Sequence, residues 1–172
     1  MKNKKEKFIV TLIMFAMFGL LSEVVFTAIG GNLSGVRDWH GLTLMGHVSI
    51  WMSFVYITAF PTLNKLNDIE WFWHKPMLFQ TIIGGFVIGI FEFVWGLILI
   101  KLFGLNCWNY ILEPFNIMGL VCLRNYIFFT LSYPLAIFII DNVQWYIYRE
   151  EEKEDVLHYN ILENYKKLIT FK

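Results

Sequence analysis

Apolar and polar positions fall in long blocks along this chain. Four apolar blocks are each long enough to cross the hydrocarbon core of a bilayer, about 30 Å thick, as a helix of roughly 20 residues. They lie at residues 8–29, 42–61, 77–103 and 119–141, and the short segments between them carry Gly, Pro, Asn or Trp. The pattern predicts an all-α fold, namely an integral membrane four-helix bundle over residues 1–145 followed by a tail over residues 146–172.

The tail has a different periodicity. Leu157, Ile161, Tyr165 and Leu168 recur at steps of three or four residues among many charged positions, so they share one helical face. This pattern predicts a short C-terminal amphipathic helix that lies on the inner leaflet or against the bundle.

Composition supports the membrane class. The 172 residues are 57% hydrophobic and only 16% charged, which is too apolar for an ordinary soluble domain of this size. The formal net charge is zero, so the sequence offers no basic surface for nucleic acid. The two cysteines, Cys107 and Cys122, define no disulfide framework and are predicted to be free thiols.

The distribution of basic residues predicts the orientation. If each apolar block crosses the membrane once, the two termini and the segment between the second and third blocks lie on one side. Most lysines and arginines fall on that side, and the opposite side carries only Arg37, Lys101 and Arg124. Because cytoplasmic loops are enriched in Lys and Arg, both termini are expected in the cytoplasm of a multi-pass cell membrane protein. The first block is long and has no small-residue cleavage site, so it is read as an uncleaved span.

The two halves of the chain repeat weakly. Four residues of the second block recur at matching positions of the fourth: Met45, Gly46, Val48 and Pro61 correspond to Met118, Gly119, Val121 and Pro134. Two tandem two-helix repeats of the same orientation would explain this correspondence. The alternative is chance, because aromatic-rich apolar segments align easily.

Small residues accompany a glutamate on two predicted helices. Gly85, Gly89, Glu92 and Gly96 share one face of the third, and the first carries Ala16, Gly19, Glu23 and Thr27 on one face. Small residues let membrane helices approach closely, so these faces are predicted contact seams with both glutamates pointing into the bundle.

Further polar residues fall at a similar depth. Counted from the predicted cytoplasmic ends, Glu23, Glu92, His47, Arg124 and Asn125 lie in the outer halves of their helices. Arg37, Asp38, His40, Asn109, Glu113 and Asn116 lie in the adjoining loops. The arrangement predicts a polar chamber that opens away from the cytoplasm and binds a ligand, with the segment from Trp108 to Asn116 as its lid.

The alternative is purely structural. One glutamate would pair with Arg124, the other would be protonated and hydrogen-bonded, and the cluster would only fix helix packing. Taken alone, His47 is most simply a core histidine that hydrogen-bonds a neighbouring helix.

Signals for cofactor or enzyme chemistry are weak. Asp38, His40, His47 and a glutamate include zinc-ligand types, but their spacing matches no helical histidine pair, so no metal or other cofactor is expected. The sequence has no GxSxG motif and no P-loop. No catalytic residue is assigned, and an enzyme is the less favoured class.

From Glu92 the sequence reads EFVWGLILIKLFGLNCWNYILEPFNIMGLVCLRN. This segment resembles the signature of the CmpB-like putative ABC-transporter type IV family, small bacterial multispan membrane proteins. The matching residues are Glu92, Gly96, Trp108, Tyr110, Pro114, Phe115, Asn116, Gly119, Cys122 and Leu123. The first half, with GLLSEVVFTAI and LTLMGHVSIWMSFVYI, is similar to the N-terminal half of the family. Asn109 departs from the aspartate usual there, which argues against proton transfer or metal binding at this position.

The resemblance implies a transport-related membrane protein, a permease or ligand-binding membrane subunit. Its expected partners are the lipid bilayer, a small-molecule, ion or lipid ligand, and further copies of the chain or a separate ATPase subunit. Two alternatives stay open. One is a membrane enzyme that acts on a lipid or other amphiphile at the outer leaflet with a glutamate as general base. The other is a structural or assembly subunit.

Overall fold

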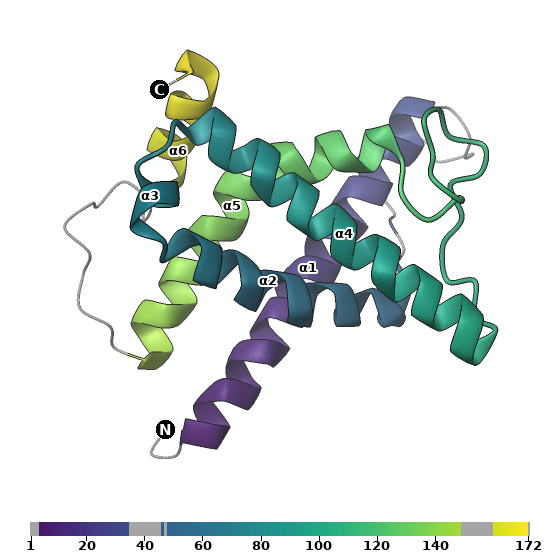
Figure 1. The fold of residues 1–172 in the computed structure, drawn as a ribbon, viewed down its shortest axis with the longest axis horizontal. Coiled ribbons are helices and arrows are strands. Elements are labelled where there is room, and N and C mark those ends of the chain that lie inside the picture. The colour runs from purple at the N-terminus through teal and green to yellow at the C-terminus, as the bar shows by residue number, and fades with distance from the viewer. Residues whose placement is uncertain (1–3, 35–45, 47, 149–159, 172) are drawn as a thin grey trace.

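The structure, a computed structural model, describes residues 4–34, 46, 48–148 and 160–171, and its regular elements in these ranges are helices (Figure 1). In chain order they are α1 (Lys4–Ser34), the 3-10 turn η2 (Ile50–Met52), α2 (Ser53–Asn67), α3 (Glu70–Trp73), α4 (Met77–Phe103), α5 (Leu123–Tyr148) and α6 (Ile161–Thr170). The predicted all-α class is confirmed.

Three of these helices are long and apolar enough to cross a membrane. They are the part of α1 from Lys4 to Ile29, all of α4 and all of α5, of 26, 27 and 26 residues. The predicted limits of the third block coincide with α4. Many of their large apolar side chains are exposed, among them Phe8, Met17, Phe86 and Leu131. Such a surface suits lipid rather than water, which agrees with the predicted membrane class.

The predicted second span differs most from the structure. The α-helix there begins at Ser53 and ends at Asn67, so its 15 residues reach only about 22 Å at 1.5 Å per residue. A fourth crossing thus stays a prediction. The helix continues through Pro61, as membrane helices can when the surrounding structure satisfies the freed backbone groups.

The helices cross one another as an oblique bundle (Figure 1). α4 packs most extensively against α5, while α2 packs against both α1 and α4. The side chains of Val55 and Leu63 from α2 and of Tyr133 and Ile137 from α5 form the fully buried centre of the core. This packing places the glutamate-bearing helices α1 and α4 on either side of α2.

The start of α5 lies later than predicted, at Leu123 rather than residue 119. Met118 and Gly119 adopt positive φ angles of 55° and 68°, which a right-handed helix cannot include. Ile117 and Val121 instead pair as an isolated β-bridge. Residues 104–122 form a long connecting segment between α4 and α5, and α5 extends to Tyr148 rather than residue 141.

The tail helix α6 packs against α4 and α5, which decides between the two predicted locations in favour of the bundle. Asn160 caps it by accepting hydrogen bonds from the backbone N–H groups of Leu162 and Glu163. Leu168 is buried, and the Tyr165 hydroxyl donates to the Leu131 carbonyl of α5 at 3.1 Å. Leu157 lies outside the described residues.

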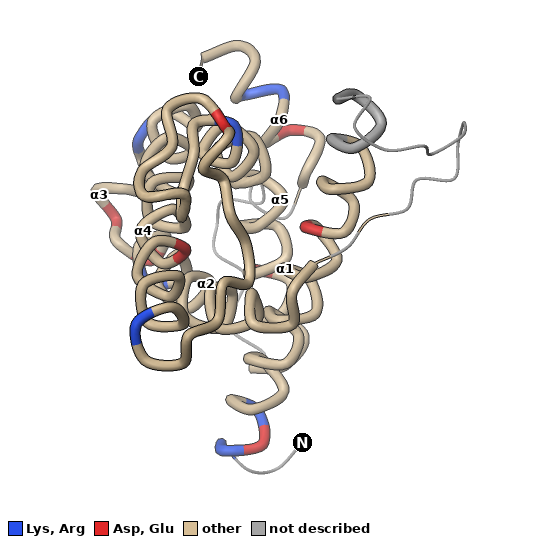
Figure 2. Tube along the Cα trace, turned by 90° about the vertical axis from the view of Figure 1, so that its right-hand side faces the viewer, with Lys and Arg blue, Asp and Glu red and all other residues tan. Residues whose placement is uncertain are grey.

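Charged residues gather near helix ends, while most of the helical body is neutral (Figure 2). The start of α1 meets the end of α5, where the Thr11 hydroxyl donates to the Tyr148 hydroxyl at 3.3 Å and Lys7 lies over the Tyr148 ring. The beginning of α1 and the end of α5 thus lie at one end of the bundle. Which side of the membrane this end faces stays a prediction, and so does the tandem repeat, since Met45 lies outside the described residues.

Candidate functional site

Glu92 of α4 is fully buried and receives two hydrogen bonds on one oxygen. The Tyr110 hydroxyl donates to Oε1 at 3.0 Å, and Asn125 Nδ2 donates to the same atom at 3.3 Å. Tyr110 belongs to the connecting segment and Asn125 to the first turn of α5. A single carboxylate oxygen thus joins three parts of the chain.

Glu23 of α1 is also buried, with 5% of its surface exposed. The Tyr56 hydroxyl of α2 donates to Glu23 Oε2 at 3.4 Å. Gly19, one turn before Glu23, lets the Tyr56 ring lie against α1, because a Cβ at this glycine would overlap the ring. Burial of both glutamates agrees with the predicted contact seams.

The two buried carboxylates are close enough to interact electrostatically. Glu23 acts electrostatically on Glu92, and both glutamates act on Tyr110. The pKa of the Tyr110 phenol lies well above its ordinary value, first because the group is buried and then because Glu92 and Glu23 disfavour a further negative charge nearby. Glu23, Tyr56, Glu92, Tyr110 and Asn125 are called the carboxylate cluster below.

Two atoms of the carboxylate cluster are buried without a hydrogen-bond partner in the described part of the chain. They are Glu92 Oε2 and Asn125 Oδ1. Both are acceptors, and buried acceptors are normally satisfied by a donor, an ordered water or a cation. The cluster therefore has unused capacity to hold something positive or hydrogen-bond donating.

Arg124 does not occupy this capacity. Its Nη1 forms a 2.8 Å ion pair with Glu113 Oε1 of the connecting segment, and its guanidinium lies 5.9 Å from the Phe26 ring centre. It acts on Glu23 only through weaker electrostatic attraction. The alternative in which Arg124 pairs directly with one buried glutamate is not found in this structure.

Trp108, Asn109 and Asn116 use their polar atoms to shape the connecting segment. Trp108 Nε1 donates to the Leu120 carbonyl, and Asn109 Oδ1 accepts from the Ile111 N–H at 2.9 Å. Asn116 donates to the carbonyls of Ile111 and Glu113 and accepts from the Gly119 N–H. These three residues shape the segment that carries Tyr110, and these hydrogen bonds do not reach the carboxylates of Glu23 or Glu92.

His47 lies outside the described residues, as do Arg37, Asp38 and His40. Within the ranges that the structure describes, no three His, Cys, Asp or Glu side chains lie close enough together to hold a metal ion. Cys107 and Cys122 are free thiols there, as predicted. Burial raises the pKa of the Cys122 thiol above its ordinary value, so this group is a poor nucleophile.

Sequence reasoning did not assign the two tyrosines to the site. Tyr110 stands among the residues of the family signature, and that position was the available signal. Tyr56 carries no comparable signal, because its role depends on the close approach of α2 to Gly19 of α1.

Comparison with known protein families identifies the family of the chain. No curated protein and no solved structure shows significant similarity to the chain. A family profile described as "Putative ABC-transporter type IV" matches residues 10–162, which covers both glutamates, the connecting segment and the start of α6. This chain therefore belongs to the putative ABC-transporter type IV family of transport-related membrane proteins.

Proposed function

We propose that the protein is a membrane transport component whose carboxylate cluster binds a small cation or a proton. The observation that carries the proposal is the pair of buried acceptors, Glu92 Oε2 and Asn125 Oδ1, that have no partner among the described residues, together with a second buried carboxylate, Glu23, that acts on Glu92 electrostatically. Three buried acceptor groups favour a positive ligand over an anion.

Energetics support a positive ligand. A charged side chain within a bilayer costs about 2.5–3.5 kcal/mol on insertion scales unless it is paired or neutralised. Among the described residues, the donors that reach Glu23 and Glu92 are neutral hydroxyl and amide groups, and Arg124 is paired with Glu113. A bound cation or proton supplies the missing positive charge.

The connecting segment is the proposed lid. Tyr110 projects from it onto Glu92, and the ion pair between Glu113 and Arg124 fastens it to the start of α5. Movement of this segment would remove one hydrogen bond from Glu92 and open the cluster. In the predicted orientation this opening faces away from the cytoplasm.

A separate subunit would supply any ATP hydrolysis. The family description names an ABC transporter, whereas this sequence contains no P-loop to bind the phosphates of ATP. We therefore propose an ATPase partner at the cytoplasmic side. Co-purification of an ATPase with the tagged full-length chain from mild detergent supports this partner, and its absence after in-cell crosslinking contradicts it.

Cation binding is tested with purified protein in proteoliposomes. Sodium, potassium and pH steps are applied while thermal unfolding is recorded, because a ligand that binds only the folded state raises the melting temperature. Glu92→Gln and Glu23→Gln are expected to fold and to lose most of the shift. Glu163→Gln, which changes an acidic residue in a partly exposed pair with Lys166, is the matched control.

Flux through the same vesicles gives the second readout. A dye trapped inside reports proton or sodium entry, and the two cluster variants are expected to reduce the rate at least tenfold. Full binding and flux in both folded variants would remove the proposal. No cation-dependent shift in the wild-type protein would remove it as well.

A further inference from the structure

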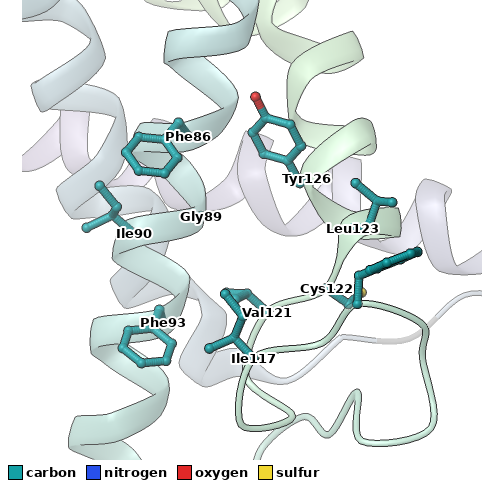
Figure 3. A pocket seen from close by; sticks show the side chains of 10 residues that line it. Phe86, Gly89, Ile90, Phe93, Ile117, Val121, Cys122, Leu123 and Tyr126 are labelled. Carbon is teal, nitrogen blue, oxygen red and sulfur yellow. The ribbon is translucent and has the colours of Figure 1, made fainter.

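A cavity of about 480 Å³ lies between α4, the connecting segment and the start of α5. In Figure 3, Phe86, Ile90 and Phe93 of α4 form one wall, and Leu123 and Tyr126 of α5 stand across from them. Val121 and Ile117 of the connecting segment lie between the two walls. Neither Glu23 nor Glu92 lines this cavity.

The walls are chemically uniform. Apart from Gly89, they consist of aliphatic and aromatic side chains, one thiol and one phenol. The phenol of Tyr126 already donates to the Ile82 carbonyl at 3.2 Å. The Cys122 thiol behaves as a small apolar group in such surroundings. The lining side chains therefore offer no charge and no free strong donor, a composition that suits a hydrocarbon ligand.

The cavity lies at the depth of lipid chains. Gly89 is 12 residues from the start of α4 and 14 from its end, which places it about 18 Å along a helix that rises 1.5 Å per residue. Phe86 and Ile90, which flank it, are 58% and 46% exposed on the apolar surface of α4. The cavity is thus continuous with the surface that meets the bilayer.

Gly89 keeps the cavity open without serving helix packing. A Cβ at Gly84, Gly85 or Gly96 would meet Tyr133, Thr130 or Leu120 respectively, so those glycines permit close contacts. A Cβ at Gly89 would meet nothing within 4 Å. The predicted contact seam is therefore wrong at Gly89. Glycine is less favourable than alanine inside a helix, but at this position it leaves space in the cavity for a ligand.

We propose that this cavity is a binding site for one acyl chain of a membrane amphiphile. Its volume falls within the range of about 300–1,000 Å³ that is usual for small-molecule sites. The chain enters sideways from the bilayer past Phe86 and Ile90, and the polar head of the amphiphile lies toward the connecting segment. The site is separate from the carboxylate cluster and does not rest on its proposed cation binding.

Photolabelling of the full-length protein in phosphatidylcholine vesicles tests the proposal. The probe is phosphatidylcholine with a diazirine at the middle of one acyl chain, and crosslinked peptides are mapped by mass spectrometry. The labelling yield of residues 86–93 and 115–126 is expected to be at least five times that of the exposed part of α1. A free fatty acid that carries the diazirine at the same position shows whether the cavity prefers the acyl chain of a phospholipid or that of a fatty acid.

Filling the cavity gives the decisive variant. Gly89→Leu places a side chain in the open space and is expected to reduce labelling of residues 115–126 at least fivefold. Val94→Phe is the matched control, because Val94 is a lipid-exposed residue of the same helix that does not line the cavity. It is expected to leave labelling unchanged.

A second variant keeps the test valid if Gly89→Leu does not fold. Ile117→Trp narrows the cavity from the connecting segment, where Ile117 is largely exposed, and is expected to have the same effect. Equal labelling of all lipid-facing helices would overturn the proposal. Unchanged labelling in a folded Gly89→Leu or Ile117→Trp protein would overturn it too.

Discussion

At the scale of single residues, the two oxygens of Glu92 have different surroundings. Oε1 accepts from Tyr110 and Asn125, whereas Oε2 is buried without a partner in the described part of the chain. The donor from Tyr110 comes from a segment with little regular structure. The stability of the connecting segment and the state of the Glu92 carboxylate therefore depend on each other.

Replacement of Tyr110 tests this dependence. Tyr110→Phe removes the 3.0 Å hydrogen bond to Glu92 and is expected to lower the free energy of unfolding by about 1–3 kcal/mol, the usual cost when a buried polar group loses its partner. Tyr126→Phe removes an exposed bond to a backbone carbonyl and is expected to cost at most about 1 kcal/mol. Thermal unfolding in detergent measures both, and equal effects would contradict the special role of Tyr110.

At the scale of elements, the contact between α4 and α5 depends on glycine at some positions and not at others. Gly84 and Gly85 lie against Tyr133 and Thr130 of α5, whereas Gly89 faces the cavity. Because all three occur within six residues of one helix, they allow a matched comparison of the two uses of glycine.

Alanine at two of these positions is expected to have opposite effects. A Cβ at Gly85 would lie 2.9 Å from the Thr130 backbone nitrogen, so Gly85→Ala should destabilise the fold by about 1–3 kcal/mol, as overpacking does. Gly89→Ala meets open space and should stabilise the helix by up to about 1 kcal/mol. Thermal unfolding of both variants checks the signs, and destabilisation by Gly89→Ala would contradict the open cavity.

The tail helix depends on the bundle for its structure. α6 has only ten residues, and isolated helices of this length are marginal in water. Leu168→Ala removes its buried apolar anchor and should speed hydrogen exchange of residues 161–170 at least tenfold, with little change in α1. Leu162→Ala, at a position 79% exposed, should leave exchange unchanged. Equal exchange in both variants would show that α6 is held in another way.

Helices were easier to predict than the geometry that joins them. The limits of α4 follow from its apolar length, and Gly104 at its end adopts the left-handed conformation that terminates helices. The end of α2 was set too early because the apolar block ends at Pro61, whereas the helix continues into the polar residues up to Asn67. The burial of Glu23 and Glu92 followed from their small neighbours, but Tyr56 and Arg124 have partners that depend on tertiary contacts.

At the scale of the whole molecule, charge distribution and helix connectivity agree. The start of α1 and the end of α5 lie at one end, whereas the connecting segment leaves α4 after Phe103 and folds back along its second half, where Tyr110 reaches Glu92. If the lysine-rich end is cytoplasmic, as the basic residues predict, then the connecting segment and the covering Tyr110 face the outside.

Thiol labelling tests this orientation. Cys107 is half-buried on the connecting segment and should react with a membrane-impermeant maleimide in intact cells, whereas Cys122 is buried and should not. In a Cys107→Ser background, Lys4→Cys should react only after the cells are permeabilised. Labelling of Lys4→Cys in intact cells would reverse the predicted orientation.

The carboxylate cluster also has a consequence for biosynthesis. Its residues span positions 23 to 125, so ribosomes complete α1 long before they reach Tyr110 or Asn125. The nascent first helix enters the translocon with an acidic side chain whose neighbours do not yet exist, and chains that terminate before Asn125 leave Glu92 without one of its two donors. Such truncated chains are expected to be unstable in the membrane, since they expose a polar group that only the finished bundle covers.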